Sequence, residues 1–364
     1  MQFTSTKKLI AVGFVAAAIT AGCTPGNTTS GGSASGNASS AAFNPDEDPA
    51  GKEFAQVRTD LGKMPTVNDE VKLGAVSKAF ENEYWRTLKE GMETGVAKAK
   101  GRGTSVSITV QSAQNESDEQ GQLSIVQNMI NQKYSALLLS PISDGNLVPG
   151  VEDANKKNIP VINVNDGIIA AAPYYVGPKA KQNGELAAEF ISKKLNAQGE
   201  VAIVIGMPKA FAARQRTAGF EEWMGKNAPN IKIVEKQNAD WDRSKSKDLA
   251  DTWIKKHPNL KAIFCNNDTM ALGVQEAVKA SGKDIVVVGV DGIGEAYKSI
   301  KAGQMDATID SFPLYKGQIA VEMGLRKLGG QELPRVIWTP QALIDSSNVN
   351  TPAEKLINWS EPQA

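Results

Sequence analysis

Polar side chains able to hold a hydroxylated molecule recur in this sequence just after short apolar runs. They are Ser77, Asn82, Tyr84, Trp85, Ser140, Asn165, Asp166, Asn267 and Asp291. Carboxylates and amides bind paired hydroxyl groups, and indole faces cover the apolar C–H side of a sugar ring. The set therefore matches a neutral polyhydroxylated ligand. Taken singly, its Ser, Asn and Asp members could equally be helix caps and turn formers.

The sequence has few of the residues that catalytic dyads and zinc sites use. The chain has a single histidine, His257, and two cysteines, Cys23 and Cys265. This argues against a zinc site and against a Ser-His or Cys-His dyad. Cys265, in AIFCNND, is expected in a buried strand, and His257 at a helix end before a proline. We expect no enzymatic activity, no cofactor and no bound metal.

The N-terminus has the pattern of an export signal. Lys7 and Lys8 precede an apolar run over 9–19, which is shorter than the roughly 20 residues that span a bilayer. We predict a signal peptide over residues 1–22 and an exported, periplasmic or cell-surface protein.

The segment Thr20-Ala21-Gly22-Cys23 resembles a bacterial lipobox, which implies cleavage before Cys23 and acylation of its thiol. An ordinary signal peptide followed by an incidental cysteine is the alternative. The Ser/Gly/Asn tract after Cys23 buries too little to order itself. We predict a lipid-anchored flexible tether over 23–70, with a reach of roughly 40 Å.

The composition is that of an ordinary globular protein. Of 364 residues, 41% are hydrophobic and 22% are charged, and the length predicts two domains after the leader and tether. Lys+Arg and Asp+Glu both number 40, so the net charge is zero and no nucleic-acid partner is expected. We expect a monomer.

From residue 71 onward, buried strand patterns alternate with helical periodicity. Strands are expected at 71–77, 105–113, 134–141, 159–166, 174–176, 200–206, 231–237, 261–267, 284–291 and 305–312, with helices between most of them. Asp268 is the expected N-cap of the helix that follows residue 267. This alternation predicts open parallel sheets covered by helices on both faces, in two lobes; a closed eight-unit barrel is the alternative. Ligands of such sheets bind beyond the carboxyl ends of the strands.

Several stretches resemble the ribose-binding-type periplasmic solute-binding proteins of sugar ABC transporters. The similarity covers about residues 71–340 and is carried by ALLLSPISD, NIPVINVND, AARQRTAGFEEW, ADWDRSK, HPNLKAIFCNNDTMALGVQEAV and IVVVGVDG. FCNNDTMALG followed by VVGVDG is its most specific part. Repressors of the lac type share this fold, but they begin with a helix-turn-helix rather than an export signal.

The resemblance implies an α/β fold of the type I periplasmic binding protein. Two Rossmann-like lobes with parallel sheets would be joined by a three-crossing hinge, the N-terminal lobe holding 71–178 plus 312–340 and the C-terminal lobe 179–311 plus 341–364. The implied function is to capture a sugar or polyol in the cleft and deliver it to a membrane permease. A sensory protein that presents its ligand to a chemoreceptor or histidine kinase, and an exported enzyme, are the alternatives.

The resemblance also implies which residues bind the ligand. They are Ser77, Asn82, Tyr84, Trp85, Ser140, Asn165 and Asp166 in the N-terminal lobe, and Arg214, Trp241, Asn267, Asp291 and Ser311 in the C-terminal lobe and hinge. Trp85 and Trp241 would sandwich the ring, and Arg214 would donate to its oxygens.

Three of these residues could instead have a purely structural role. Arg214 can pair with a nearby carboxylate, leaving Arg216 or neither at the ligand. Trp241 can be a core or surface aromatic, and Asp291 can cap a turn. Ribose binders carry Asp-Arg at Asn165-Asp166 and glutamine near Ser311, so another pentose, a hexose, a polyol or a cyclitol fits as well as ribose.

Overall fold

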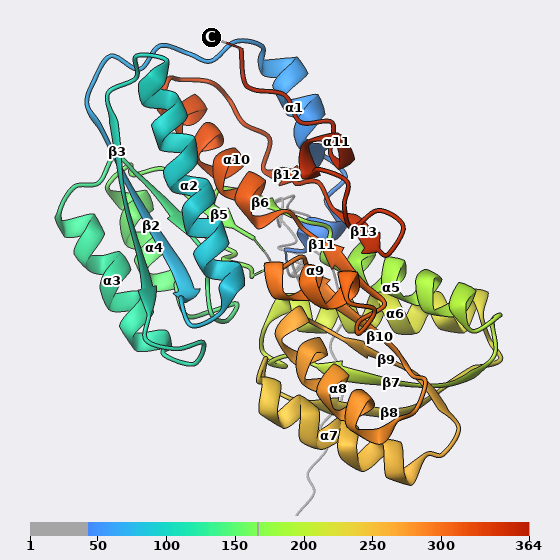
Figure 1. The fold of residues 1–364 in the computed structure, drawn as a ribbon. Helices are drawn as coiled ribbons and strands as arrows, with labels where there is room; N and C mark the ends of the chain where they lie inside the picture. Colours follow the sequence, from blue (N-terminus) through green and yellow to red (C-terminus); the bar gives the residue numbers. More distant parts are fainter. Residues whose placement is uncertain (1–42, 166, 364) are drawn as a thin grey trace, which may run out of the picture. The chain divides into compact units, whose positions relative to one another are not determined.

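The computed structural model describes residues 43–165 and 167–363, which form two lobes (Figure 1). The N-lobe is built on a seven-stranded sheet with the order β1-β12-β6-β5-β4-β2-β3, in which every neighbouring pair is parallel. Its strands are β1 (Lys52–Glu53), β2 (Val71–Ala79), β3 (Val106–Ala113), β4 (Ala136–Leu139), β5 (Val161–Val164), β6 (Tyr174–Gly177) and β12 (Val336–Trp338).

The C-lobe is built on a six-stranded sheet with the order β13-β11-β10-β9-β7-β8. All its pairs are parallel except β11 with β13. Its strands are β7 (Gly199–Ile205), β8 (Ile231–Asn238), β9 (Leu260–Cys265), β10 (Val286–Asp291), β11 (Ala307–Asp310) and β13 (Ala342–Asp345). Both sheets are open, so the predicted two-lobed α/β fold is confirmed and the closed barrel is excluded.

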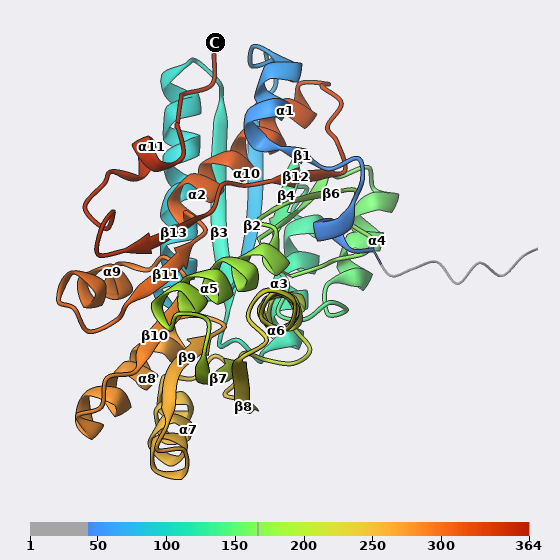
Figure 2. The same ribbon diagram turned by 90° about the vertical axis from the view of Figure 1, so that its right-hand side faces the viewer.

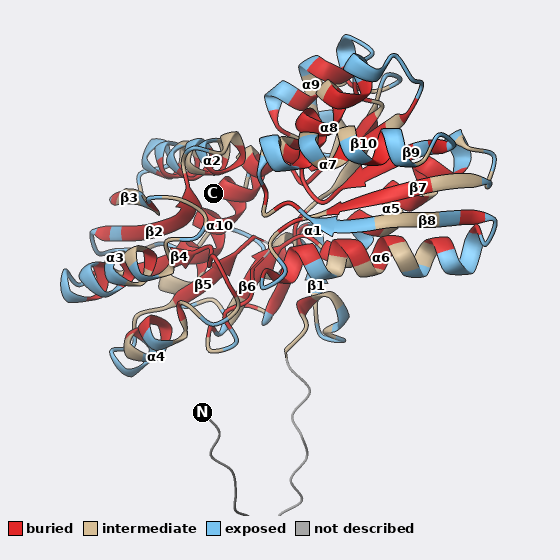
Figure 3. Cartoon of the chain, turned by 90° about the horizontal axis from the view of Figure 1, so that it is seen from below, coloured by how far each residue is buried: buried red, intermediate tan, exposed pale blue. Residues whose placement is uncertain are grey.

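Helices cover both faces of each sheet, and most of them bury one side and expose the other (Figure 3). On the N-lobe they are α1 (Phe54–Leu61), α2 (Glu83–Gly101), α3 (Glu119–Asn131), α4 (Val148–Lys156) and α10 (Pro313–Leu328). On the C-lobe they are α5 (Ala180–Lys194), α6 (Phe211–Asn227), α7 (Arg243–Lys256), α8 (Asp268–Ser281) and α9 (Gly294–Lys301). Two short helices, η1 (Pro45–Glu47) and α11 (Ala353–Leu356), lie near the two ends of the described part of the chain.

The chain passes between the sheets three times, as the hinge prediction requires. The crossings run from β6 to α5, from β11 to α10 and from β12 to β13. The first carries the chain into the C-lobe, and the second returns it to place α10 beside α2 (Figure 1). The third adds β13 to the edge of the C-lobe sheet, beside β11 (Figure 2). No helix of the described part of the chain is long and apolar enough to cross a membrane.

The predicted tether is wrong for residues 43–70, most of which fold onto the N-lobe, while Asp46 also contacts α5 of the C-lobe. Phe54 and Val57 of α1 are buried, and β1 pairs with β12. The side chain of Arg58 forms an ion pair with Glu322 of α10, with an N–O distance of 2.6 Å. The apolar residues of FAQVRTDL supply the buried surface that the Ser/Gly/Asn tract lacks. Cys23 and the predicted signal peptide lie outside the described residues.

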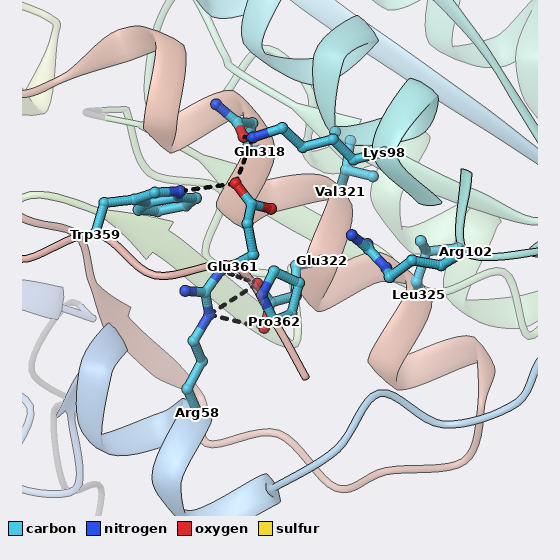
Figure 4. Close-up of a pocket in the computed structure, with 11 residues that line it drawn as sticks. Arg58, Lys98, Arg102, Gln318, Val321, Glu322, Leu325, Trp359, Glu361 and Pro362 are labelled. Carbon is cyan, nitrogen blue, oxygen red and sulfur yellow. Dashed lines mark hydrogen bonds and ion pairs between the residues drawn. The ribbon is translucent and has the colours of Figure 1, made fainter. Parts of the chain in front are cut away.

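The predicted C-lobe boundary is also wrong at the C-terminus. After β13, the tail returns to the N-lobe, where the Trp359 ring packs against Phe54 and Tyr315, with centroid distances of 6.0 and 4.8 Å. Figure 4 shows a pocket formed here, lined by residues of α1, α2, α10 and the tail. The sequence signal for this return is weak, because the tail has only scattered apolar residues.

Candidate functional site

A narrow pocket lies between the two lobes, open to solvent, where the carboxyl ends of strands from both sheets face each other. It is lined by Lys78, Asn82, Tyr84, Trp85, Glu116, Arg216, Trp241, Asn267 and Asp291. The structure thus brings together many of the predicted ligand contacts from both lobes. Lys78 and Glu116, and Arg216 in place of Arg214, are additions to the predicted set.

Two indoles, one from each lobe, line this pocket. Trp85, in the first turn of α2, and Trp241, in the loop before α7, are both almost fully buried. The Lys78 Nζ atom lies 5.1 Å from the centroid of the Trp85 ring and 5.8 Å from that of Trp241. A cation therefore accompanies the two aromatic faces, which also attract cations electrostatically.

Trp241 reaches the pocket because a glycine makes room for it. A Cβ atom at Gly206, just after β7, would lie 2.1 Å from carbons of the indole ring. The backbone of Trp241 itself has a positive φ of 67°, an uncommon conformation for a bulky residue. Gly206 and this turn together aim the indole across the end of β7.

The loop after β3 supplies an acceptor that sequence reasoning missed. One carboxylate oxygen of Glu116 accepts hydrogen bonds from Trp85 Nε1 at 2.8 Å and from Asn82 Nδ2 at 3.1 Å. Asn82 also caps α2, since its Oδ1 accepts from the Tyr84 amide at 3.0 Å. Glu116 follows a predicted strand, so the strand-end rule could have found it.

Tyr84 lines the pocket, and its hydroxyl group belongs to a buried polar cluster at the hinge. Its hydroxyl donates to Asn165 Oδ1 at 2.5 Å and lies 3.4 Å from Ser311 Oγ. The fully buried Lys316 of α10 donates to the Tyr84 hydroxyl oxygen at 2.8 Å and to Asn165 Oδ1 at 2.7 Å. Asn165 and Ser311 therefore contact the lining residue Tyr84 but do not line the pocket themselves. Sequence reasoning missed Lys316, because it lies 232 positions from Tyr84.

Ser77 and Ser140 are buried at the ends of β2 and β4, away from the pocket lining. Gln122 Nε2 holds these two strand ends together by donating to both backbone carbonyls, at 3.0 and 2.9 Å. Among the described residues, neither serine hydroxyl has a hydrogen-bond partner. Asp166, the remaining predicted contact of this lobe, lies outside the described residues.

Arg214 does not reach the pocket, which corrects its predicted role. Its guanidinium is half exposed and forms an ion pair with Asp144 on the rim. Arg216, two residues further along α6, is rotated by about 200° around the helix and points inward. Arg216 Nη1 donates to the Asn266 carbonyl at 2.6 Å and lies 3.3 Å from Asp291 Oδ1. Arg216 is 1% exposed, so this is a buried cation facing a carboxylate.

On the C-lobe side of the pocket, the buried carboxylate of Asp268 holds a backbone turn in place. Asn267, not the predicted Asp268, is the N-cap of α8, and its Oδ1 accepts from the Met270 amide at 2.9 Å. Asp268 instead accepts from the amides of Gly292 and Ile293, at 2.8 and 3.0 Å. Burial, with a smaller effect from nearby Asp291, raises the pKa of Asp268. Asp268 thereby fixes the turn that follows Asp291.

Cys265 and His257 lie where the sequence analysis predicts them. Cys265 is buried in β9, where desolvation raises the pKa of its thiol, and His257 is the C-cap of α7. Within residues 43–165 and 167–363, no cluster of His, Cys, Asp and Glu could hold a metal ion.

Comparison with known proteins shows the family. Residues 73–332 match the family model described as "Periplasmic binding protein domain". The chain belongs to this family. Membership of this binding-protein family agrees with the prediction that the protein is not an enzyme.

Two curated relatives extend this finding. The chain is 34% identical to the Ribose import binding protein RbsB of Bacillus subtilis over 275 residues, or 75% of this chain and 87% of the relative. It is 38% identical to the D-allose-binding periplasmic protein of Escherichia coli over 259 residues, or 68% and 81% of the two chains.

Solved structures agree with these matches. An ABC transporter periplasmic solute binding protein from Actinobacillus succinogenes with bound D-allose superposes with a TM-score of 0.71 at 28% identity, covering 78% of this chain and 100% of that one. One from Bacillus halodurans with bound myo-inositol gives 0.70 at 26% identity, covering 78% and 97%.

Proposed function

We propose that this protein is the solute-binding component of an ABC transporter and captures a single sugar or polyol ring in the pocket between its lobes. The observation that carries the proposal is the lining of that pocket. Each lobe contributes one indole and at least one charged side chain to the same small space. Trp85 and Trp241 cover the faces of the ring, while Asn82, Tyr84, Asn267 and Asp291 serve its hydroxyls.

The charge of the pocket lining narrows the ligand class. The described lining has two cations, Lys78 and Arg216, and two carboxylates, Glu116 and Asp291. This balance favours a neutral molecule over a sugar acid or a sugar phosphate. The D-allose and myo-inositol of the matched structures are neutral rings.

Transport then follows from the hinge. Because the two walls belong to different lobes, a ligand makes its full set of contacts only when the lobes meet, and it shifts the population toward the closed form. The closed form is the one presented to a membrane permease. An acyl anchor on Cys23 would keep the protein at the membrane surface; metabolic labelling with a fatty acid tests it, and Cys23→Ser should abolish the label.

The test begins with a thermal-shift screen of pentoses, hexoses, polyols and cyclitols, since a ligand that binds only the folded state raises the melting temperature. The strongest hit is then titrated by calorimetry into wild type and Trp241→Ala. We expect one-to-one binding to wild type and a loss of at least about 100-fold in the variant, because it lacks one wall of the pocket. Unchanged affinity in the variant, or no hit in the screen, would contradict the proposal.

A further inference from the structure

Three of the polar contacts between described residues of the two lobes lie outside the lining of the sugar pocket. The first runs from α2 to the N-terminus of α9, where the Glu83 carboxylate accepts from the amides of Gly294 and Glu295, at 3.1 and 3.3 Å. Unpaired amides and the helix dipole favour an anion at this end of a helix. Glu83 of the N-lobe thus caps a helix of the C-lobe.

The other two contacts are ion pairs across the rim. Lys209, in the loop before α6, pairs with Glu119 at the start of α3. Arg214 of α6 pairs with Asp144 in the loop after β4. Among the residues that the structure describes, the pocket lining includes neither pair, and it does not include Glu83.

We propose that Glu83, Lys209 and Arg214 are positioning residues that set the sugar affinity by stabilising the closed state. All three contacts join side chains or amides of different lobes, so they form when the lobes meet and break when they part. The apparent dissociation constant is the intrinsic one divided by the fraction of binding-competent protein. Contacts that raise the closed fraction therefore tighten binding without touching the sugar. This inference rests on the proposed function.

The expected effects are modest and salt-dependent. An exposed ion pair or a capping carboxylate contributes enough to change an equilibrium by about two- to fivefold. Losing all three contacts should therefore weaken sugar binding by about tenfold or more. At about 1 M salt the Debye length is about 3 Å, so the difference between wild type and variants should shrink.

The test uses variants that disturb two of these contacts, the Lys209–Glu119 pair and the Glu83 cap, in different ways. Lys209→Glu and Glu119→Lys should each weaken binding, and the double variant should restore it. Gly294→Ala would place a Cβ atom 2.7 Å from Glu83 Oε1, which disturbs the cap without removing a charge. The matched control is Lys236→Ala, because the pair of Lys236 with Glu221 lies within the C-lobe at the same exposures, 46% and 34%, as the Arg214–Asp144 pair.

Two readouts separate the possible failures. Calorimetry with the sugar from the screen should show weaker binding for the single variants, wild-type affinity for the control, and faster sugar release in stopped-flow measurements. X-ray scattering of the sugar-free proteins should show a larger radius of gyration in Lys209→Glu and Gly294→Ala than in wild type. Wild-type affinity and an unchanged radius in these variants would overturn the inference. If no sugar binds wild type, the proposed function fails, and the scattering comparison alone decides the inference.

Discussion

At the scale of single residues, the C-lobe wall of the pocket depends on Arg216. Its guanidinium is buried between the Asn266 carbonyl and Asp291, so its donors are already aligned toward acceptors. A lysine would keep the charge but would lose the planar fork that binds two oxygens at once.

We therefore expect Arg216→Lys to weaken sugar binding by about 10- to 100-fold, equivalent to about 1.4–3 kcal/mol. Arg214→Lys on the same helix keeps a cation beside Asp144 and should change the affinity less than about threefold. Calorimetry on both variants checks this. Equal losses in the two would show that Arg216 has no special place at the ligand.

A second residue-scale prediction concerns the position of Trp241. Gly206→Ala puts a methyl group where the indole ring lies, so the ring must move. We expect sugar binding to weaken at least about tenfold. Gly225→Ala is the matched control, because nothing lies within 4 Å of a Cβ at that position of α6. A Gly206→Ala protein that binds as tightly as the Gly225→Ala protein would contradict the role of this glycine.

The site residues that could be predicted from sequence are the polar and aromatic residues that follow an expected strand. Asn82, Trp85, Asn267 and Asp291 belong to this group. The choice between Arg214 and Arg216 needed the rotation of α6, which its weakly patterned sequence does not define. Lys316 needed the return of the chain across the hinge, a contact between distant parts of the sequence.

At the scale of elements, the N-terminal segment ties the two lobes together near the hinge. Asp46 accepts from the amides of Ala180 and Lys181 in the first turn of α5, at 3.0 and 2.7 Å. The backbone carbonyl of Pro45 accepts from Trp338 Nε1 of β12, at 2.9 Å. Residues 43–70 precede the family match at residue 73, so family resemblance carried no information about them.

Asp46 should make stability depend on pH. Burial raises the pKa of this carboxyl from 3.8 to about 6, because desolvation outweighs the two amide bonds. The unfolded carboxyl loses its proton first as the pH rises, so the stabilisation due to this group is complete below about pH 4 and is lost as the pH passes 6. Relative to Asp46→Asn, wild type should lose up to about 3 kcal/mol of unfolding free energy between about pH 4 and 7. Urea unfolding of both proteins over this range checks it, and a constant difference would contradict it.

The attachment of α1 can be tested separately. Arg58→Ala removes a largely buried partner of Glu322, while Arg326 Nε still donates to that carboxylate at 2.9 Å. We expect the unfolding free energy to fall by about 2 kcal/mol. Lys52→Ala, which breaks the exposed pair with Asp60, should leave the unfolding free energy almost unchanged. Wild-type stability in both variants would contradict a stabilising attachment of α1 to the N-lobe.

At the scale of the whole molecule, the alternation of strands and helices was enough to predict two open sheets with their ligand edge. Buried runs such as ALLL and VVVGV have the pattern of central parallel strands, and they form β4 and most of β10. The packing of α1 and of the C-terminal tail on the N-lobe was not predicted. Both segments are short and are stabilised by tertiary contacts rather than by their own periodicity.

The central claim is that one neutral sugar or polyol ring is enclosed between the lobes. A crystal structure of the protein with the molecule selected by the thermal-shift screen measures this directly. We expect ring density between the indoles of Trp85 and Trp241, within hydrogen-bonding distance of Arg216 and Asp291. Density for the molecule at any other place, with this pocket free of it, would contradict the account.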